Sequence, residues 1–250
     1  MNLILKKVFQ LISYLSHPLL IPTYVLFILM TVNPYLFGVN EPLTIGRFFS
    51  SFFLRFTEGA AALDSKPELK ALILLTLSVF FITFVLPVVS MLMMKSLGLV
   101  QSLEMQERKE RIIPLVLTGI FYLWLFYNFY KRYDMHPAYT SFILGATIAL
   151  FIAFFINNFI KISLHATGMG GLTAFIALAM WMFTDSKFNV QLSSAQTLQV
   201  SMNVVLICSI LATGLVCTAR LYLKAHVLRD IAGGLFIGMA SQFIAFRIMI

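Results

Sequence analysis

Residues 69–94 read LKALILLTLSVFFITFVLPVVSMLMM, and Lys70 is the one charged residue among them. A helix that crosses the hydrocarbon layer of a membrane needs about 20 consecutive, mostly apolar residues. This stretch is longer, and its apolar residues run continuously instead of alternating with polar residues as they do in a barrel strand. It therefore predicts a transmembrane helix.

The same pattern recurs along the chain. Seven apolar segments can be drawn, at residues 8–32, 69–94, 112–130, 138–160, 166–183, 200–223 and 227–248. They use up nearly the whole chain and leave no room for a separate soluble domain. We expect an all-α fold, a polytopic transmembrane helical bundle of about six to seven helices. Residues 1–250 would form a single integral membrane domain, with N-terminal helices in 1–100 and a motif-bearing core at about 101–238.

The composition supports this interpretation. Hydrophobic residues make up 60% of the chain and charged residues 11%, and the mean hydropathy is +0.92, whereas a typical soluble domain has about 25% charged residues. The net charge is +8, but the Lys and Arg residues lie in short loops between apolar segments. Anionic lipid headgroups or an anionic substrate are therefore the expected partners, not nucleic acid. The expected location is the cell membrane.

The first apolar segment has unusual features. Pro18 and Pro22 each remove a backbone donor and clash with the preceding turn, so we expect a kink or an interrupted helix there. His17 would be a polar residue inside the bundle or near an interface. The stretch at 33–68 is expected to be an ordered interfacial loop that lies in part along the membrane surface.

Three loops are expected on one side of the membrane. The loops at 95–111, 160–165 and 222–226 are separated from one another by two spanning segments each. They hold nearly every residue whose side chain could take part in catalysis or ligand binding. His136, in contrast, lies in a short loop that is expected on the opposite side. This convergence indicates an active site.

The last of these loops leads into the sequence ARLYLKAHVLRDIAGG at 219–234, which contains the pattern R-x5-H-x3-D. His226 and Asp230 are four residues apart, so they share a face on a helix. A carboxylate beside one ring nitrogen fixes the tautomer and leaves the other nitrogen as a nucleophile or base. Arg220 supplies a permanent positive charge suited to phosphate oxygens. The alternative is an interfacial cluster of charges that caps two helices.

The middle loop leads into KISLHATGMGG at 161–171. Close helix packing explains Gly168 and Gly171. His165, two residues after Ser163, is harder to explain in this way. An ionisable residue at the end of a membrane helix, facing other ionisable groups, is a functional hypothesis by default.

The first loop ends with QERKERIIP at 106–114. Arg108, Lys109 and Arg111 could clamp an anion. The acidic residues that alternate with them make a solvated helix start an equal alternative.

These motifs resemble those of the type 2 phosphatidic acid phosphatase superfamily, membrane-embedded phosphatases that use histidine and no metal. The third motif of that family, S-R-x5-H-x3-D, is matched at every position but the first, where Ala219 replaces Ser. Its second motif, P-S-G-H, is matched in part, since Ser163 and His165 are present and the Pro and Gly are not.

The first motif of the family, K-x6-R-P, is matched poorly. Alignment on Pro114 places Gln106 and Ile113 where Lys and Arg belong. The resemblance covers roughly residues 101–238, and only the third motif is specific.

The resemblance implies a role for each matched residue. His226 would attack phosphorus, Asp230 would orient it, and His165 would protonate the departing lipid alkoxide. The nonbridging phosphate oxygens would be held by Arg220 and Ser163, with Arg108 and Arg111 completing the clamp. Neither a metal nor another cofactor is implied.

The leading hypothesis is a membrane lipid phosphate phosphatase that hydrolyses a phosphomonoester or pyrophosphate of a lipid through a phosphohistidine intermediate. Its partners would be the lipid phosphate and membrane lipids. Phosphatidate, phosphatidylglycerol phosphate, an isoprenoid pyrophosphate and a lipid A phosphate all present the same headgroup chemistry. Two alternatives stay open: a transporter of anions or protons, and a non-catalytic relative of the phosphatase family.

Overall fold

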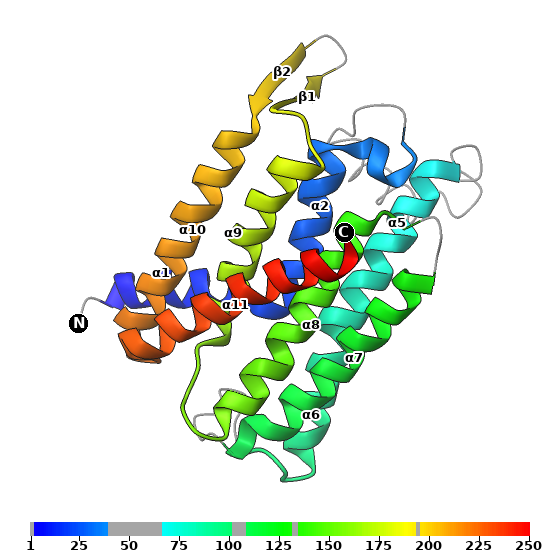
Figure 1. The fold of residues 1–250 in the computed structure, drawn as a ribbon. Helices are drawn as coiled ribbons and strands as arrows, with labels where there is room; N and C mark the ends of the chain where they lie inside the picture. The colour runs from blue at the N-terminus through cyan, green and yellow to red at the C-terminus, as the bar shows by residue number, and fades with distance from the viewer. Residues whose placement is uncertain (1–2, 40–66, 102–108, 132–134, 194–195) are drawn as a thin grey trace.

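The structure, a computed structural model, describes residues 3–39, 67–101, 109–131, 135–193 and 196–250. Its elements, with the labels of Figure 1, are α1 (Leu3–Leu15), η1 (Pro18–Leu20), α2 (Ile21–Val32), η2 (Pro34–Phe37), α5 (Pro67–Phe80), η3 (Phe81–Val85), α6 (Leu86–Ser96), η4 (Lys109–Arg111), α7 (Ile112–Lys131), α8 (Pro137–Asn157), α9 (Leu164–Met182), β1 (Lys187–Ser193), β2 (Gln196–Ser201), α10 (Met202–Tyr222) and α11 (Leu228–Met249).

The fold is a polytopic helical bundle, as the sequence predicts. Within the described residues, seven helical segments are long and apolar enough to cross a membrane, and each overlaps one of the seven predicted segments. The chain is thus a multi-pass membrane protein. Most of the predicted loop at 33–68 lies outside the described residues, and its first part forms η2.

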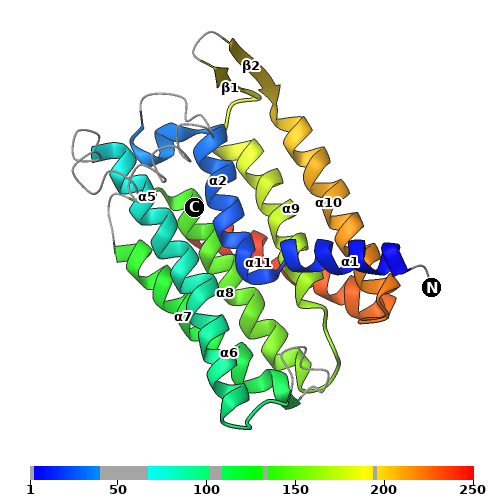
Figure 2. The same ribbon diagram turned by 180° about the vertical axis from the view of Figure 1, so that it is seen from behind.

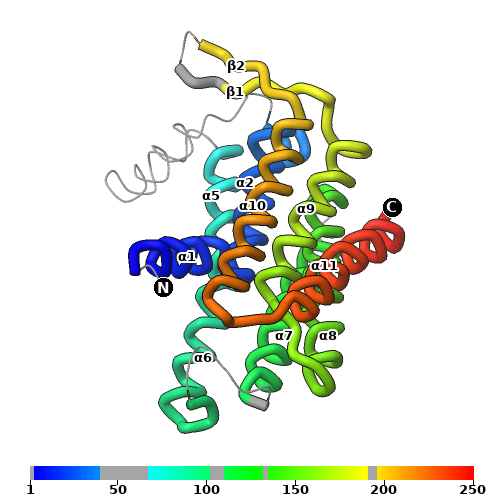
Figure 3. The backbone as a smooth tube through the Cα atoms, turned by 90° about the vertical axis from the view of Figure 1, so that its left-hand side faces the viewer, coloured from blue at the N-terminus to red at the C-terminus, as the bar shows by residue number. Residues whose placement is uncertain are grey.

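Most helices run along the bundle, and two do not. Figures 1 and 2 show α11 crossing the bundle obliquely, and it packs against α8 and α9. Figure 3 shows α1 lying across the bundle while α2 runs along it. The helix α1 packs against α10.

The bend between α1 and α2 lies where the prolines predict an interruption. After α1 ends at Leu15, His17 precedes the short helix η1 and its Nδ1 atom accepts the N–H of Leu19 at 3.4 Å. Pro18 occupies the first position of η1, where its missing N–H costs nothing. The interrupted helix expected from the sequence is therefore confirmed.

A small hairpin joins α9 to α10. Strands β1 and β2 pair antiparallel, with Phe188 opposite Val200 and Val190 opposite Leu198. This hairpin is not expected from the sequence, because its short alternating pattern is a weak signal beside the long apolar segments. It extends beyond the end of the bundle in Figure 1.

Glycines allow α9 and α11 to approach closely. A Cβ atom on Gly234 would lie 2.6 Å from the carbonyl oxygen of Ser163, and one on Gly170 would lie 2.7 Å from that of Leu235. A Cβ atom on Gly238 would overlap the carbonyl oxygen of Thr167. Small residues at such crossings are typical of membrane helices, where van der Waals packing drives association.

Substitution of Gly238 by Ala should destabilise the protein, because the added methyl group meets backbone atoms that cannot move aside. We expect a cost of about 1–3 kcal/mol, typical of overpacking, seen as a lower midpoint of thermal unfolding in detergent. Gly214→Ala in α10 is the matched control, since nothing lies within 4 Å of its added Cβ. Equal midpoints for the two variants would contradict the close contact.

Candidate active site

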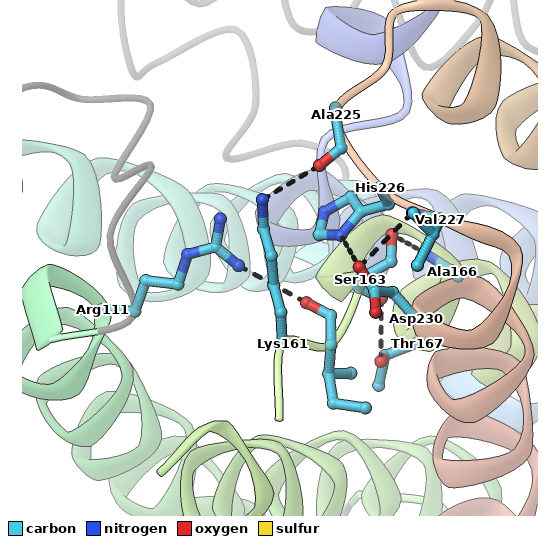
Figure 4. A network of polar contacts seen from close by, with 10 residues as sticks. Arg111, Lys161, Ser163, Ala166, Thr167, Ala225, His226, Val227 and Asp230 are labelled. Carbon is cyan, nitrogen blue, oxygen red and sulfur yellow. Dashed lines mark hydrogen bonds and ion pairs between the residues drawn. The ribbon is translucent and has the colours of Figure 1, made fainter. Parts of the chain in front are cut away.

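The centre of the site is a pair of side chains at the beginning of α11. His226 lies in the loop before this helix and Asp230 in its first turn, and the Nδ1 atom of His226 is 3.2 Å from a carboxylate oxygen of Asp230. Because a carboxylate only accepts, Nδ1 donates, and Nε2 of the neutral ring carries the lone pair. Figure 4 shows this second nitrogen turned away from Asp230, toward Lys161.

Asp230 makes a second contact with the same oxygen. It accepts the backbone N–H of Val227 at 3.4 Å. Val227 is the residue just before α11 and its side chain makes no capping hydrogen bond, so the carboxylate satisfies one of the free N–H groups of the helix end. Asp230 is buried, and two contacts fix its position.

The chain turns sharply before His226. Lys224 adopts a left-handed conformation with φ of 53°, and the N–H of Ala225 donates to the C=O of Arg220 at 3.1 Å. Glycine is usual in such helix-ending turns, and a lysine there costs about 1–2 kcal/mol. This strained turn lets Arg220 and His226 line the same cavity.

Three cationic side chains lie near His226. Arg111 comes from η4, Lys161 from the loop before α9 and Arg220 from the last turn of α10. The Nζ atom of Lys161 donates a hydrogen bond to the C=O of Ala225 at 3.1 Å, which holds it beside the histidine. Figure 4 shows Lys161 extending to the C=O of Ala225 and the guanidinium of Arg111 directed toward Lys161.

These charges act on His226. Burial, together with the positive charges of Arg220, Lys161 and Arg111, lowers the pKa of the His226 imidazole to about 4, although the hydrogen bond with Asp230 acts in the opposite direction. The imidazole is therefore neutral at pH 7. Its Nε2 lone pair is available to an electrophile.

His165 belongs to the first turn of α9. Its Nε2 atom lies 3.0 Å from the C=O of Ser13 in α1. A carbonyl only accepts, so Nε2 carries a proton, and Nδ1 is the atom able to exchange a proton with a ligand. The ring of His17 packs edge-on against that of His165, with centroids 5.6 Å apart.

These groups share one cavity of about 680 Å³. Five of the site residues named above line its wall: Arg111, Lys161, His165, Arg220 and His226. None of the lining residues in the described part of the chain is an Asp or Glu. The cavity has an excess of positive charge and is suited to an anion.

The remaining predicted residues lie elsewhere. Asp230 lies behind His226 and outside the cavity lining. Ser163 is fully buried and also outside the lining, and its hydroxyl accepts the N–H of Ala166 at 3.5 Å where α9 begins. The phosphate contact expected of Ser163 stays a prediction. Arg108 lies outside the described residues, as does Gln106.

Several residues of the cavity wall belong to none of the sequence motifs. One of them is Lys161. Four others lie on the N-terminal segment: Lys6, Gln10, Ser13 and His17. These four recur every three or four residues, so the ones in α1 lie on one helical face. This regular spacing of polar residues within an apolar segment is the sequence feature that could have predicted their place in the cavity wall. His17 was expected only inside the bundle or near an interface, and it lies beside His165.

The arrangement suits nucleophilic chemistry on an anion. A neutral, oriented imidazole lies near three cations, and a second imidazole lines the same cavity. Among the described residues, no three His, Cys, Asp or Glu side chains group as metal ligands. The prediction that the reaction needs no metal is left to a chelation test.

Comparisons of the chain with protein-family models, with curated proteins and with solved structures found no match. The fold and the site therefore rest on the sequence and the geometry described above.

The lowered pKa of His226 predicts how it reacts with diethyl pyrocarbonate, which acylates neutral imidazole. The reaction rate should stay level as the pH falls from 7 to 5 and decline only near the folded pKa of about 4. In the denatured protein the decline should begin near the ordinary value of about 6.5. Mass spectrometry of the peptide containing His226 gives both profiles, and identical profiles would contradict the lowered pKa.

Proposed function

We propose that this protein is a lipid phosphate phosphatase in which His226 forms a phosphohistidine intermediate. The observation that carries the proposal is the His226 and Asp230 pair, whose free ring nitrogen faces a cavity with three cations. Nucleophilic catalysis requires such a group together with a second residue that orients it. The motif resemblance described above adds support, since it assigns the same roles.

In the first half-reaction, the Nε2 lone pair of His226 attacks phosphorus in line with the lipid oxygen. A nitrogen–phosphorus bond forms, the phosphorus–oxygen bond to the lipid breaks, and the electron pair leaves with the lipid alkoxide. Asp230 stabilises the charge that develops on the imidazole through its bond with Nδ1. For a pyrophosphate substrate, the leaving group would be the lipid monophosphate.

His165 is suited to serve the leaving group. Because its Nε2–H is bonded to Ser13, a proton on Nδ1 is the one that passes to the lipid oxygen. In the second half-reaction His165 would take a proton from water, which attacks the phosphohistidine. The products are inorganic phosphate and the lipid alcohol, and both histidines return to their starting states.

Arg111, Lys161 and Arg220 would hold the nonbridging oxygens. Phosphoryl transfer spreads negative charge over these oxygens, so fixed cations stabilise the transition state. Burial lowers the pKa of Lys161, as Arg111 does, and Asp230 opposes this. A phosphate in the cavity would favour the charged lysine in the same way as Asp230.

A lipid substrate fits the setting of the site. The cationic residues lie at helix ends of a membrane bundle, where the headgroup of a lipid could reach them from the membrane interface. Anionic headgroups are attracted to such clusters of Lys and Arg.

We expect His226→Ala to abolish phosphate release from a panel of lipid phosphates in detergent and to remove any acid-labile phosphoprotein. His136→Ala is the control, because His136 lies at the beginning of α8 and outside the cavity lining. It should retain turnover. A chelator should leave the wild-type rate unchanged.

Full turnover in the His226→Ala variant would rule out this mechanism. A metal requirement revealed by chelation and restored by one ion would also count against it. Anion binding without turnover in the wild type would favour the transporter or the non-catalytic alternative.

The role of His165 predicts a dependence on the leaving group. His165→Ala should slow lipid phosphates by about 10²–10⁴-fold, the usual contribution of general acid catalysis. p-Nitrophenyl phosphate needs little protonation of its leaving group and should be slowed much less. Asp230→Asn acts on the nucleophile and should slow both substrates alike. A similar loss on both substrates in His165→Ala would remove the acid role.

A further inference from the structure

The cavity continues from the cationic site into the interior of the bundle. Beyond His226 and His165 its walls come from α6, α7, α8 and α11, through residues such as Met91, Leu115, Leu150 and Gln242. Gln242 is twelve residues beyond Asp230 on α11, which corresponds to about 18 Å along the helix. The cavity is therefore an elongated space with a charged end and a mostly apolar arm.

Two polar side chains along this arm are bonded within the protein. The hydroxyl of Thr167 donates to the C=O of Ser163 at 3.1 Å. Gln242, which is 3% exposed, donates its amide to the C=O of Phe142 at 3.3 Å. A mostly apolar arm in which the Thr167 hydroxyl and the Gln242 amide are already bonded suits a hydrocarbon chain more than a row of water or ions.

Small residues leave the arm open, and Gln242 closes its inner end. Ala146 and Ala149 on α8 line it where larger side chains would fill it. A Cβ atom on Gly145 would lie 2.6 Å from the side chain of Gln242. The glutamine is thus held between α8 and α11 and forms the floor.

We infer that this arm receives the hydrocarbon chain of the substrate, which makes a single-chain lipid phosphate the preferred class. The inference rests on the proposed function for its charged end. The volume of about 680 Å³ lies within the range of about 300–1,000 Å³ for pockets that enclose one small ligand. We expect a phosphate and one chain to fill a space of this size and the second chain of a diacyl lipid to lie outside it.

The selectivity is steric in origin. A lipid tail leaves the membrane or a micelle, which is as apolar as the arm, so each extra methylene gains little by transfer. A chain longer than the arm must fold back or withdraw the phosphate from His226. Turnover should therefore depend on chain length with a limit set near Gln242.

The test uses monoalkyl phosphates of increasing chain length and a diacyl phosphatidate, with phosphate release as the readout. Ala146→Leu shortens the arm and should lower kcat/KM for the longest chains at least tenfold while short chains keep their rate. Gln242→Ala removes the floor and should move the limit toward longer chains. Ala71→Leu, on an exposed position of α5, is the control and should leave the profile unchanged. Parallel losses at every chain length would overturn the inference.

A second measurement does not depend on catalysis. A non-hydrolysable alkyl phosphonate with a diazirine at the end of its chain should label α8 and α11 near Ala146 and Gln242 on illumination, in the His226→Ala variant as well. Labelling confined to lipid-exposed positions would overturn the inference even if phosphatase activity is found. Labelling of the arm without any turnover would instead refute the proposed function and retain the chain-binding cavity.

Discussion

The close contact between α9 and α11 is the constraint on which the site depends. Gly234 and Gly238 allow the two backbones to meet, and the N–H of Ser163 donates to the C=O of Asp230 at 3.2 Å. Backbone groups in a membrane protein must find partners within the protein. This hydrogen bond satisfies one backbone N–H and one backbone C=O where the two helices begin. It also holds His165 and His226 at the same cavity, although they are far apart in sequence.

Within that frame, the electrostatics of the site favour an anionic ligand. Moving cations out of water is costly unless partners compensate. Here the C=O groups of Ala225 and Ile162 accept from Lys161 and Arg111, and Asp230 adds one negative charge. The donors are held by the protein before any ligand enters. Such preorganised charges need not rearrange as charge develops on a bound group.

Much of this arrangement could be predicted from the sequence. The long apolar segments predict the helical bundle. The number of spanning segments between them predicts that the loops before α7, α9 and α11 lie on one side of the membrane. The spacing of four residues between His226 and Asp230 predicts that their side chains lie on the same face of a helix. Helical periodicity is a local property, so these features follow from residues that are neighbours in the chain.

Other parts depend on contacts that no local pattern specifies. No sequence motif includes Lys161, and only the fold places it on the C=O of Ala225. Ser163 matched a family motif, yet the way α9 begins leaves its hydroxyl bonded to the N–H of Ala166. The depth of the cavity depends on how α8 and α11 cross.

The bend at Pro18 shows how one local feature changes the use of a whole segment. In a straight helix, the polar residues of α1 would lie among lipid tails, where they are costly. The bend turns α1 across the bundle, so that Ser13 accepts from His165 and Lys6 and Gln10 line the cavity. The opposite face exposes Ile4 and Leu11, and apolar side chains suit contact with lipid. A segment that would otherwise only cross the membrane therefore becomes a wall of the site, because its proline breaks the helix next to a histidine.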